Sequence, residues 1–222
     1  MPLNIALDGP AGAGKSSIAK AVAKQLNILY LDTGAMYRAV GVACMRRGVS
    51  REDEAAVTAT CADVKIGVRH GANGQETLLD GEDVSEAIRT PDASMAASKV
   101  ATYGGVRRMM VALQQQLAAE NDVIMDGRDI GTRVLPDAKV KVFLTATPEE
   151  RAMRRFRDLQ EKHLPDTYEQ VLADIIRRDE QDMNREVDPL RQAEDAVLLD
   201  TTHLTEEESI AALIAIVEEK RA

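Results

Sequence analysis

The sequence predicts an α/β fold: a five-stranded parallel sheet flanked by helices, with a small inserted antiparallel β subdomain and a separate helical segment at 148–185. The main observation is a repeated order, in which a short apolar run is followed by a pattern at helical spacing. The strand runs are almost continuously aliphatic, as is typical of parallel strands buried on both faces. Alternating strands and helices therefore indicate a parallel sheet covered by helices and joined by right-handed crossovers.

The elements follow in chain order. The expected strands cover residues 3–8, 28–32, 123–126, 140–146 and 196–200. Helical patterns cover residues 15–26, 34–47, 148–163 and 205–221. Two of these helices begin with a Thr-x-x-Glu capping box, Thr147 with Glu150 and Thr205 with Glu208, and Pro148 occupies a first helical position.

The segment at 63–90 interrupts this order. Residues 64–70 and 76–79 are typical of a β-hairpin around Gly71-Ala72-Asn73-Gly74. An antiparallel hairpin has no place in a parallel sheet. We therefore expect one domain over residues 1–222 with a small β insertion.

Composition excludes several classes of function. The chain has 45% apolar residues and 29% charged residues, ordinary values for a globular protein of 222 residues. The net charge of −9 disfavours non-specific nucleic-acid binding, and 3% aromatic residues disfavour the stacking of single-stranded bases. We expect neither a nucleic-acid partner nor a membrane partner.

No run approaches the length of a membrane span, and the N-terminus leads directly into a strand without a signal sequence. A cytoplasmic protein is therefore expected. Cys44 and Cys61 lack metal-binding spacing and are expected to be reduced, packed thiols. The three histidines, His70, His163 and His203, are expected to be solvated.

The sharpest motif lies between the first strand and the first helix. It fits G-x-x-x-x-G-K-[ST], the P-loop, in which backbone N–H groups and a helix N-terminus surround phosphates. Lys15 would reach the β- and γ-phosphates, and the hydroxyl of Ser16 could ligate Mg²⁺. The expected nucleotide-binding residues are Gly9, Pro10, Ala11, Gly12, Ala13, Gly14, Lys15, Ser16 and Ser17.

A P-loop alone does not name a reaction, because ATPases, GTPases and kinases share it. No N-K-x-D-like or D-x-x-G segment indicates a GTPase. Three further groups could bind a second substrate: residues 32–38, residues 126–132, and the arginine-rich stretch from 150 to 191. The first two follow strands, where parallel-sheet ligands bind. Each has a structural alternative: a surface arginine, a buried ion pair, or a solvated helix face.

Taken together, these residues resemble the bacterial cytidylate kinases, the CMP kinases of the nucleoside monophosphate kinase group. The resemblance covers essentially the whole chain, including 81–85 and 88–89 in the insertion. It depends on four separated motifs: Ile5-Ala6-Leu7-Asp8 before the P-loop, Leu31-Asp32-Thr33-Gly34-Ala35-Met36-Tyr37-Arg38, Asp126-Gly127-Arg128-Asp129-Ile130-Gly131-Thr132, and Arg178-Asp179-Glu180-Gln181-Asp182-Met183-Asn184-Arg185.

The resemblance implies a role for each matching position. Thr33 and Arg38 would hold the acceptor monophosphate. Cytosine would be read by Ser98, Arg107 and Asp129. Arg178 and Asp182 would meet the acceptor ribose, whereas Arg128 and Arg185 would contact phosphate. A lid at 148–185 would close over ATP with Arg151, Arg154 and Arg155, and residues 33–120 would form the monophosphate-binding region.

These roles imply ATP-dependent, direct in-line transfer to CMP and also to dCMP, with Mg²⁺ accompanying ATP. Lys15, Arg128, Arg185 and Arg155 would offset the charge that develops on the transferred group. A carboxylate at Asp129 would accept from the N4 amine of cytosine and repel the carbonyl of uracil. A monomer is expected.

Two positions depart from the family pattern. Thr33 stands where the family often has Ser, and Gly104-Gly105 stands where it commonly has Pro and a larger residue. The two glycines predict a break in a helical segment. Two alternative functions stay open at this point: a kinase for UMP, dTMP or another metabolite, and a non-catalytic nucleotide-binding switch.

Overall fold

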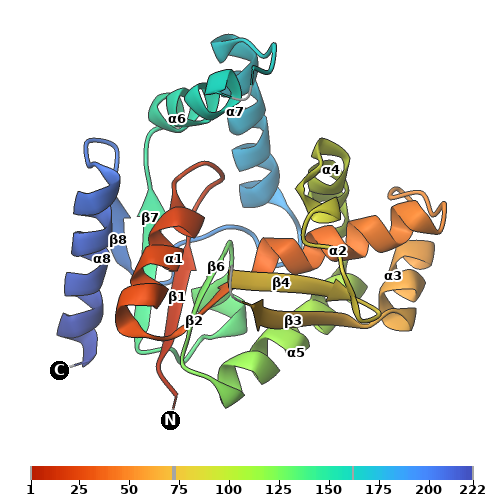
Figure 1. Cartoon of the computed structure of the whole chain (residues 1–222), viewed down its shortest axis with the longest axis horizontal. Helices are drawn as coiled ribbons and strands as arrows, with labels where there is room; N and C mark the ends of the chain where they lie inside the picture. Colours follow the sequence, from red (N-terminus) through yellow and green to blue (C-terminus); the bar gives the residue numbers. More distant parts are fainter. Residues whose placement is uncertain (1, 72–73, 162, 222) are drawn as a thin grey trace. The chain divides into compact units, whose positions relative to one another are not determined.

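The computed structural model describes residues 2–71, 74–161 and 163–221 (Figure 1). The expected parallel sheet is confirmed, with strand order β2-β6-β1-β7-β8. In β1 and β7, Ile5, Leu7, Val140 and Leu144 are fully buried, which explains why both strands are mainly apolar. The five strands are β1 (Asn4–Asp8), β2 (Leu29–Asp32), β6 (Val123–Gly127), β7 (Val140–Thr145) and β8 (Val197–Asp200).

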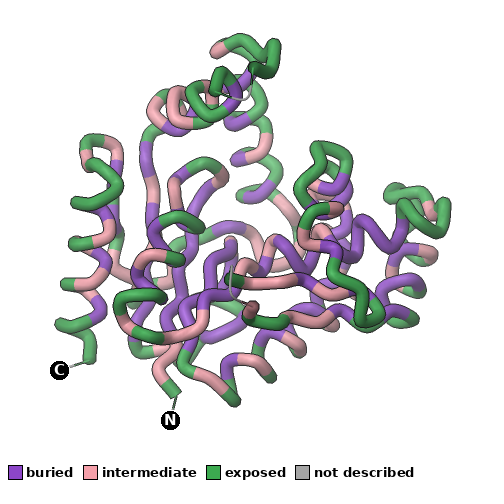
Figure 2. The backbone as a smooth tube through the Cα atoms, in the orientation of Figure 1, coloured by how far each residue is buried: buried purple, intermediate pink, exposed green. Residues whose placement is uncertain are grey.

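The chain forms two compact units, one consisting mainly of Leu29–Val123 and the other of Leu3–Ile28 with Ile124–Ala222. The second unit contains β1, β7 and β8, in which β1 pairs with β7 and β7 with β8, both in parallel. Figure 1 shows α1 (Lys15–Leu26) alongside α8 (Glu206–Arg221) in this unit. In Figure 2 the sheet strands are mostly buried, whereas much of α8 is exposed.

Both predicted capping boxes mark helix starts, but only one closes in both directions. At α8, the Thr205 hydroxyl accepts from the Glu208 N–H, and the Glu208 carboxylate accepts from the Thr205 N–H. At α6 (Pro148–Glu161), Thr147 accepts from the Glu150 N–H at 3.3 Å. The Glu150 carboxylate instead accepts from Arg154, four residues along the helix. A charged partner on the same helix face has replaced the backbone as its donor.

Helices α6 and α7 (Tyr168–Asn184) pack against each other through an apolar cluster. Helix α7 begins with its own capping box, in which Thr167 and Gln170 exchange hydrogen bonds. The Phe156 and Tyr168 rings meet edge to face, with centroids 6.2 Å apart. The cluster consists of Ala152, Leu159, Val171 and Ile175, with Phe156, Tyr168 and Leu172 against it.

The first unit holds the predicted insertion. Strands β3 (Ile66–Gly71) and β4 (Gly74–Leu79) pair antiparallel, which confirms the hairpin, and β5 (Glu82–Asp83) adds a short third strand. The turn residues Ala72 and Asn73 lie outside the described residues. The helices of this unit are α2 (Thr33–Arg46), α3 (Glu54–Asp63), α4 (Pro91–Val100) and α5 (Gly104–Glu120).

The break predicted at Gly104-Gly105 lies immediately before these residues. Helix α4 ends at Val100 and α5 begins at Gly104, so residues 101–103 connect the two helices. Gly105 is required by packing: a Cβ built there would lie 2.4 Å from Cγ2 of Thr58 on α3. The glycine therefore allows α3 and α5 to approach closely.

Substitution of Gly105 by alanine is expected to destabilise the protein by about 1–3 kcal/mol, the usual cost of overpacking. Because the clash is with the Thr58 side chain, Thr58→Ala should recover most of that loss when combined with Gly105→Ala. Urea unfolding of the two single variants and the double variant measures the coupling. Additive losses would show that Thr58 does not cause the effect.

The remaining sequence expectations concern cysteines, histidines and membrane spans. Cys44 and Cys61 are free and buried, as expected, and burial raises the pKa of Cys61 to about 11. His70, His163 and His203 are exposed. Among the described helices, none has the length and apolar character needed to cross a bilayer.

Candidate functional site

The loop from Gly9 to Ser16 joins β1 to α1, the strand–loop–helix context that the phosphate-binding motif requires. Gly9 has φ of 149°, and a Cβ at this position would lie 1.9 Å from the carbonyl oxygen of Leu144. Gly14 is the N-cap of α1 with φ of 90°, a conformation that disfavours side chains. The two glycines thus give the loop its tight backbone path.

Lys15 is folded back over its own loop. Its Nζ donates to the carbonyl oxygens of Gly9 and Pro10 at 2.8 and 2.7 Å, and the residue is 6% exposed. The pKa of Lys15 is lowered to about 7, first by burial and then by the charge of Arg128. The shift is opposed by Asp126, Asp8 and Asp182. A lysine held this way can be drawn onto an anion that enters the loop, because an anion would restore its charged form.

Ser16 and Asp126 bring two hard oxygen ligands together. The Ser16 hydroxyl donates to Oδ2 of Asp126 at 2.6 Å. Mg²⁺ prefers oxygen ligands and is commonly held by one or two protein groups plus substrate phosphates, so this pair fits it. The described residues contain no group of three or more His, Cys, Asp and Glu side chains that could hold a metal alone.

Asp126 was not among the predicted site residues. It was noted only as part of the acidic segment that follows the third expected strand. Its position at the end of a buried strand was the available signal, since ligands bind at the carboxyl ends of parallel strands.

Two ion pairs, one buried and one partly buried, lie beyond the end of β6. Nε of Arg128 donates to Oδ2 of Asp182 at 2.7 Å, and Arg185 donates to Oδ1 of Asp129 at 3.3 Å. Burial raises the pKa of Asp182, but the Arg128 charge and hydrogen bond outweigh it and hold the pKa below its usual value. The charges of Arg178 and Arg185 also lower the pKa of Asp182. The structure thus gathers three predicted arginines around two predicted aspartates in the second unit.

The three expected lid arginines lie in different environments. Arg151 is buried and bonds both carboxylate oxygens of Asp179, at 2.6 and 3.1 Å. Its guanidinium also donates to the carbonyl oxygen of Ala11 in the P-loop at 2.9 Å. Arg154 donates to the Thr201 carbonyl at 2.6 Å, whereas Arg155 is exposed. Arg151 therefore ties α6 to α7 and to the phosphate-binding loop.

In the first unit, Asp32 organises the start of α2. It is the N-cap residue, accepting from the Ala35 N–H at 2.9 Å, and its other oxygen accepts from Arg38 at 2.7 Å. The Gln75 side chain in β4 bonds both the N–H and the carbonyl of Asp32, at 2.7 and 3.3 Å. Thr33 is the first residue of α2 and is buried. Gln75 of the insertion hairpin thus holds the N-cap residue of α2, the helix that carries the predicted substrate residues Thr33 and Arg38.

The other two predicted residues of this unit lie on the helices that follow. Arg107 on α5 is 2% exposed, donates to the Ala101 carbonyl at 3.3 Å, and lies over the Tyr37 ring at 5.9 Å. Ser98 is half-buried on α4. Sequence reasoning missed Tyr37 and Gln75 as supporting residues, since only the tertiary structure shows that they contact Arg107 and Asp32.

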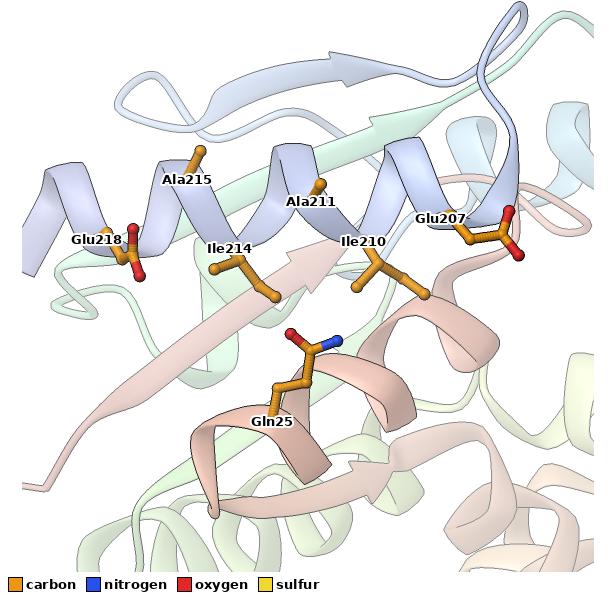
Figure 3. A pocket seen from close by; sticks show the side chains of 7 residues that line it. All are labelled: Gln25, Glu207, Ile210, Ala211, Ile214, Ala215 and Glu218. Carbon is orange, nitrogen blue, oxygen red and sulfur yellow. The ribbon is translucent and has the colours of Figure 1, made fainter.

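A groove between α1 and α8 is a poor candidate for the reaction site. It is lined by Gln25 and by one face of α8, including Ile210 and Ile214 (Figure 3). It holds no P-loop residue and has no converging set of polar groups among its lining residues. Its volume of about 370 Å³ reflects a shallow apolar surface between two helices.

Comparison with known proteins gives consistent matches along the chain. The family model described as cytidylate kinase matches residues 5–219. A cytidylate kinase of Enterococcus faecalis is 49% identical over 98% of this chain and 96% of its own length. One of Carboxydothermus hydrogenoformans is 48% identical over 98% of both chains. An uncharacterized protein from Eubacterium ventriosum, with a solved structure, has a TM-score of 0.52 at 11% identity over 99% of both chains, which supports the fold alone.

Proposed function

We propose roles for the site residues from one premise: this chain belongs to the cytidylate kinase family. It is an ATP-dependent nucleoside monophosphate kinase that phosphorylates CMP. The two alternative functions, another metabolite kinase and a non-catalytic switch, are not favoured, because the relatives match over nearly the full chain. The observation that carries the residue assignment is the cluster of paired arginines and aspartates beyond β6, in the same unit as the P-loop.

On the donor side, the backbone N–H groups of residues 11–17 receive the ATP phosphates, and Lys15 leaves the Gly9 and Pro10 carbonyls to contact them. Ser16 and Asp126 would hold Mg²⁺. When bound, Mg²⁺ neutralises phosphate charge and fixes the orientation of the phosphate chain. Arg151 positions the loop through Ala11, and Arg154 and Arg155 add positive charge at the lid.

On the acceptor side, Thr33 and Arg38 hold the CMP phosphate, and Asp32 keeps the Arg38 guanidinium in place. Ser98, Arg107 and Asp129 read cytosine. Arg178 and Asp182 meet the ribose. Arg128 and Arg185, each paired with a carboxylate in the structure, stabilise the charge of the transferred phosphoryl group.

Transfer proceeds directly from ATP to CMP without a covalent enzyme intermediate. A phosphate oxygen of CMP is already a nucleophile, so the enzyme needs no dedicated base. What this chain supplies is therefore position and positive charge. The cytoplasmic location and monomeric state expected from the sequence stay predictions.

The function is tested by a coupled assay with ATP and a panel of CMP, dCMP, UMP and AMP. CMP should give the highest kcat/KM. If Asp182 and Arg178 engage mainly the 3′-hydroxyl, dCMP should also be a substrate. A higher kcat/KM for UMP or AMP would overturn the cytosine assignment, and failure of dCMP alone would show that the 2′-hydroxyl is required.

We expect the segment 148–185 to behave as a lid whose base is already fixed. The Arg151–Asp179 pair and the Ala11 contact hold one end of α6 in the free protein. Hydrogen exchange at residues 153–161 should therefore slow when ATP and CMP bind together, with a smaller change near Asp179. Measurement by mass spectrometry with ATP alone provides the control. Equal protection of 153–161 in free and bound protein would contradict a lid.

A further inference from the structure

Asp8, the last residue of β1, has no role in the scheme above, yet both oxygens of its carboxylate accept backbone hydrogen bonds. It is 4% exposed. Its Oδ1 accepts from the Ile130 N–H and its Oδ2 from the Gly131 N–H, both at 2.7 Å. Each oxygen of the buried Asp8 carboxylate thus accepts a hydrogen bond from one of two adjacent backbone N–H groups, which lie far from Asp8 in the sequence.

The two donors begin a π-helical turn, Ile130–Val134, that follows directly after Asp129. The first N–H groups of any helical turn lack acceptors within the turn, and an Asp at the N-cap position usually provides one. Asp129 occupies that position, but its side chain makes no capping hydrogen bond. Asp8 caps the turn in its place.

Because Asp8 caps the turn, the side chain of Asp129 is not needed there. Because Asp8 satisfies the N–H groups of the turn, the Asp129 carboxylate is directed elsewhere and bonds Arg185 at 3.3 Å. Asp129 has φ of −149° and ψ of 27°, outside the helical range, so its backbone is held by its surroundings. Its carbonyl accepts from the Arg133 and Val134 N–H groups at 2.8 and 3.2 Å, and Asp8 holds the next two residues through their N–H groups.

The electrostatic surroundings of Asp8 agree with a buried anion placed between two functional segments. Burial raises its pKa to about 6, while the two N–H bonds lower it. The charge of Asp129 also raises the pKa and that of Lys15 lowers it. Asp8 in turn contributes to the raised pKa of Arg128. Its position therefore affects both the P-loop lysine and the segment that carries Arg128 and Asp129.

We propose that Asp8 is a positioning residue for base specificity: by capping the turn at Ile130 and Gly131, it holds Asp129 in the orientation that reads the acceptor base. This inference rests on the proposed role of Asp129 in cytosine recognition. Asp8 itself does not contact the substrate in this scheme. Its effect on the reaction passes through the backbone of residues 129–131.

The test is Asp8→Asn, which keeps the size of the side chain. An amide oxygen can accept one of the two N–H bonds, but the NH₂ group would face the second donor. We expect kcat/KM for CMP to fall by about tenfold, mainly through KM, because one buried donor loses its partner. The CMP/UMP ratio of kcat/KM should fall with it.

A second readout does not depend on activity. Hydrogen exchange in a peptide covering residues 128–134 should become faster in Asp8→Asn. Leu213→Ala is the control: Leu213 is fully buried on α8 in the same unit, so its truncation should lower Tm. This control should leave the CMP/UMP ratio and the exchange of residues 128–134 unchanged.

A second variant covers the case in which Asp8→Asn does not fold. A Cβ on Gly131 would lie 3.3 Å from Oδ2 of Asp8 and from Cδ of Lys141, so Gly131→Ala should disturb the same cap and lower the same ratio. An unchanged CMP/UMP ratio and unchanged exchange in a folded variant would overturn the proposal. Wild-type protein without CMP kinase activity would instead refute the proposed function, and the exchange measurement would still report on the cap.

Discussion

Lys15→Ala is expected to lower kcat by roughly 10³-fold or more while leaving the fold intact, because phosphoryl transfer depends on preorganised positive charge at the γ-phosphate. The Lys15 side chain donates to the carbonyls of Gly9 and Pro10 in the phosphate-binding loop. Among the predicted catalytic residues that the structure describes, it alone does so. Steady-state kinetics at saturating ATP and CMP measure the loss. Lys24→Ala, which removes an exposed lysine of the same helix, is the matched control.

The same variant should change how stability depends on pH. The folded-state pKa of Lys15, about 7, lies below its ordinary value of 10.5, so the native state binds fewer protons than the unfolded state between these values. The wild-type protein should therefore gain stability as pH rises from 7 to 10.5, and at pH 7 or below it bears the full cost of the buried charge. Lys15→Ala lacks this pH-dependent contribution to stability.

Thermal unfolding at pH 6.5 and pH 9, without nucleotide, compares the two proteins. At pH 6.5 the Tm of Lys15→Ala should be higher relative to wild type, and this difference in Tm should shrink at pH 9. Near-normal turnover by Lys15→Ala would contradict the assignment of the P-loop as the donor site. A constant difference in Tm across the two pH values would show that the lysine is not held in a desolvated state.

The main sheet could be predicted because its signal is local. The mainly apolar strands β1 and β7 are buried on both faces, and the P-loop motif requires the strand and helix on either side of it. Helices α3, α4 and α5 were not predicted as separate elements. No strand stands directly before any of these three helices, so the alternation of strand and helix does not mark them, and α5 begins at Gly104.

The site residues were more predictable than their partners. Asp182 was expected beside Arg178, but its hydrogen bond comes from Arg128, 54 residues away in the chain. Gln75 bonds the backbone of Asp32 from a separate hairpin, and no local pattern marks it. Sequence motifs identify which side chains are chemically able to act. Their orientation depends on residues that reach them only through the fold.

Asp129→Asn is expected to lower kcat/KM for CMP. The loss should correspond to about 1–3 kcal/mol of transition-state binding, the scale of one directed base contact. The carboxylate accepts from the N4 amine of cytosine, whereas UMP presents a carbonyl at that position. An Asn amide can rotate to offer either an oxygen or an N–H. UMP should therefore lose less than CMP, or gain, and the CMP/UMP ratio should shrink.

The substitution also disturbs a buried ion pair, so a matched control is needed. Arg185 is 6% exposed in its side chain, and without the Asp129 charge it retains the Asp188 carbonyl as an acceptor. Asp182→Asn removes the comparable partner of Arg128, which is also buried in part. Both variants should lose stability, because each leaves an arginine with less compensation.

A comparison of CMP with UMP as the acceptor distinguishes the roles of Asp129 and Asp182. The ribose is common to CMP and UMP, so Asp182→Asn should lower kcat/KM for both by the same factor. The base differs, so Asp129→Asn should not. Kinetics with both acceptors, together with Tm for each variant, distinguish lost recognition from lost stability. If Asp129→Asn behaves like Asp182→Asn, with equal losses for CMP and UMP, Asp129 supports Arg185 and does not read the base, and cytosine recognition then depends on Ser98 and Arg107.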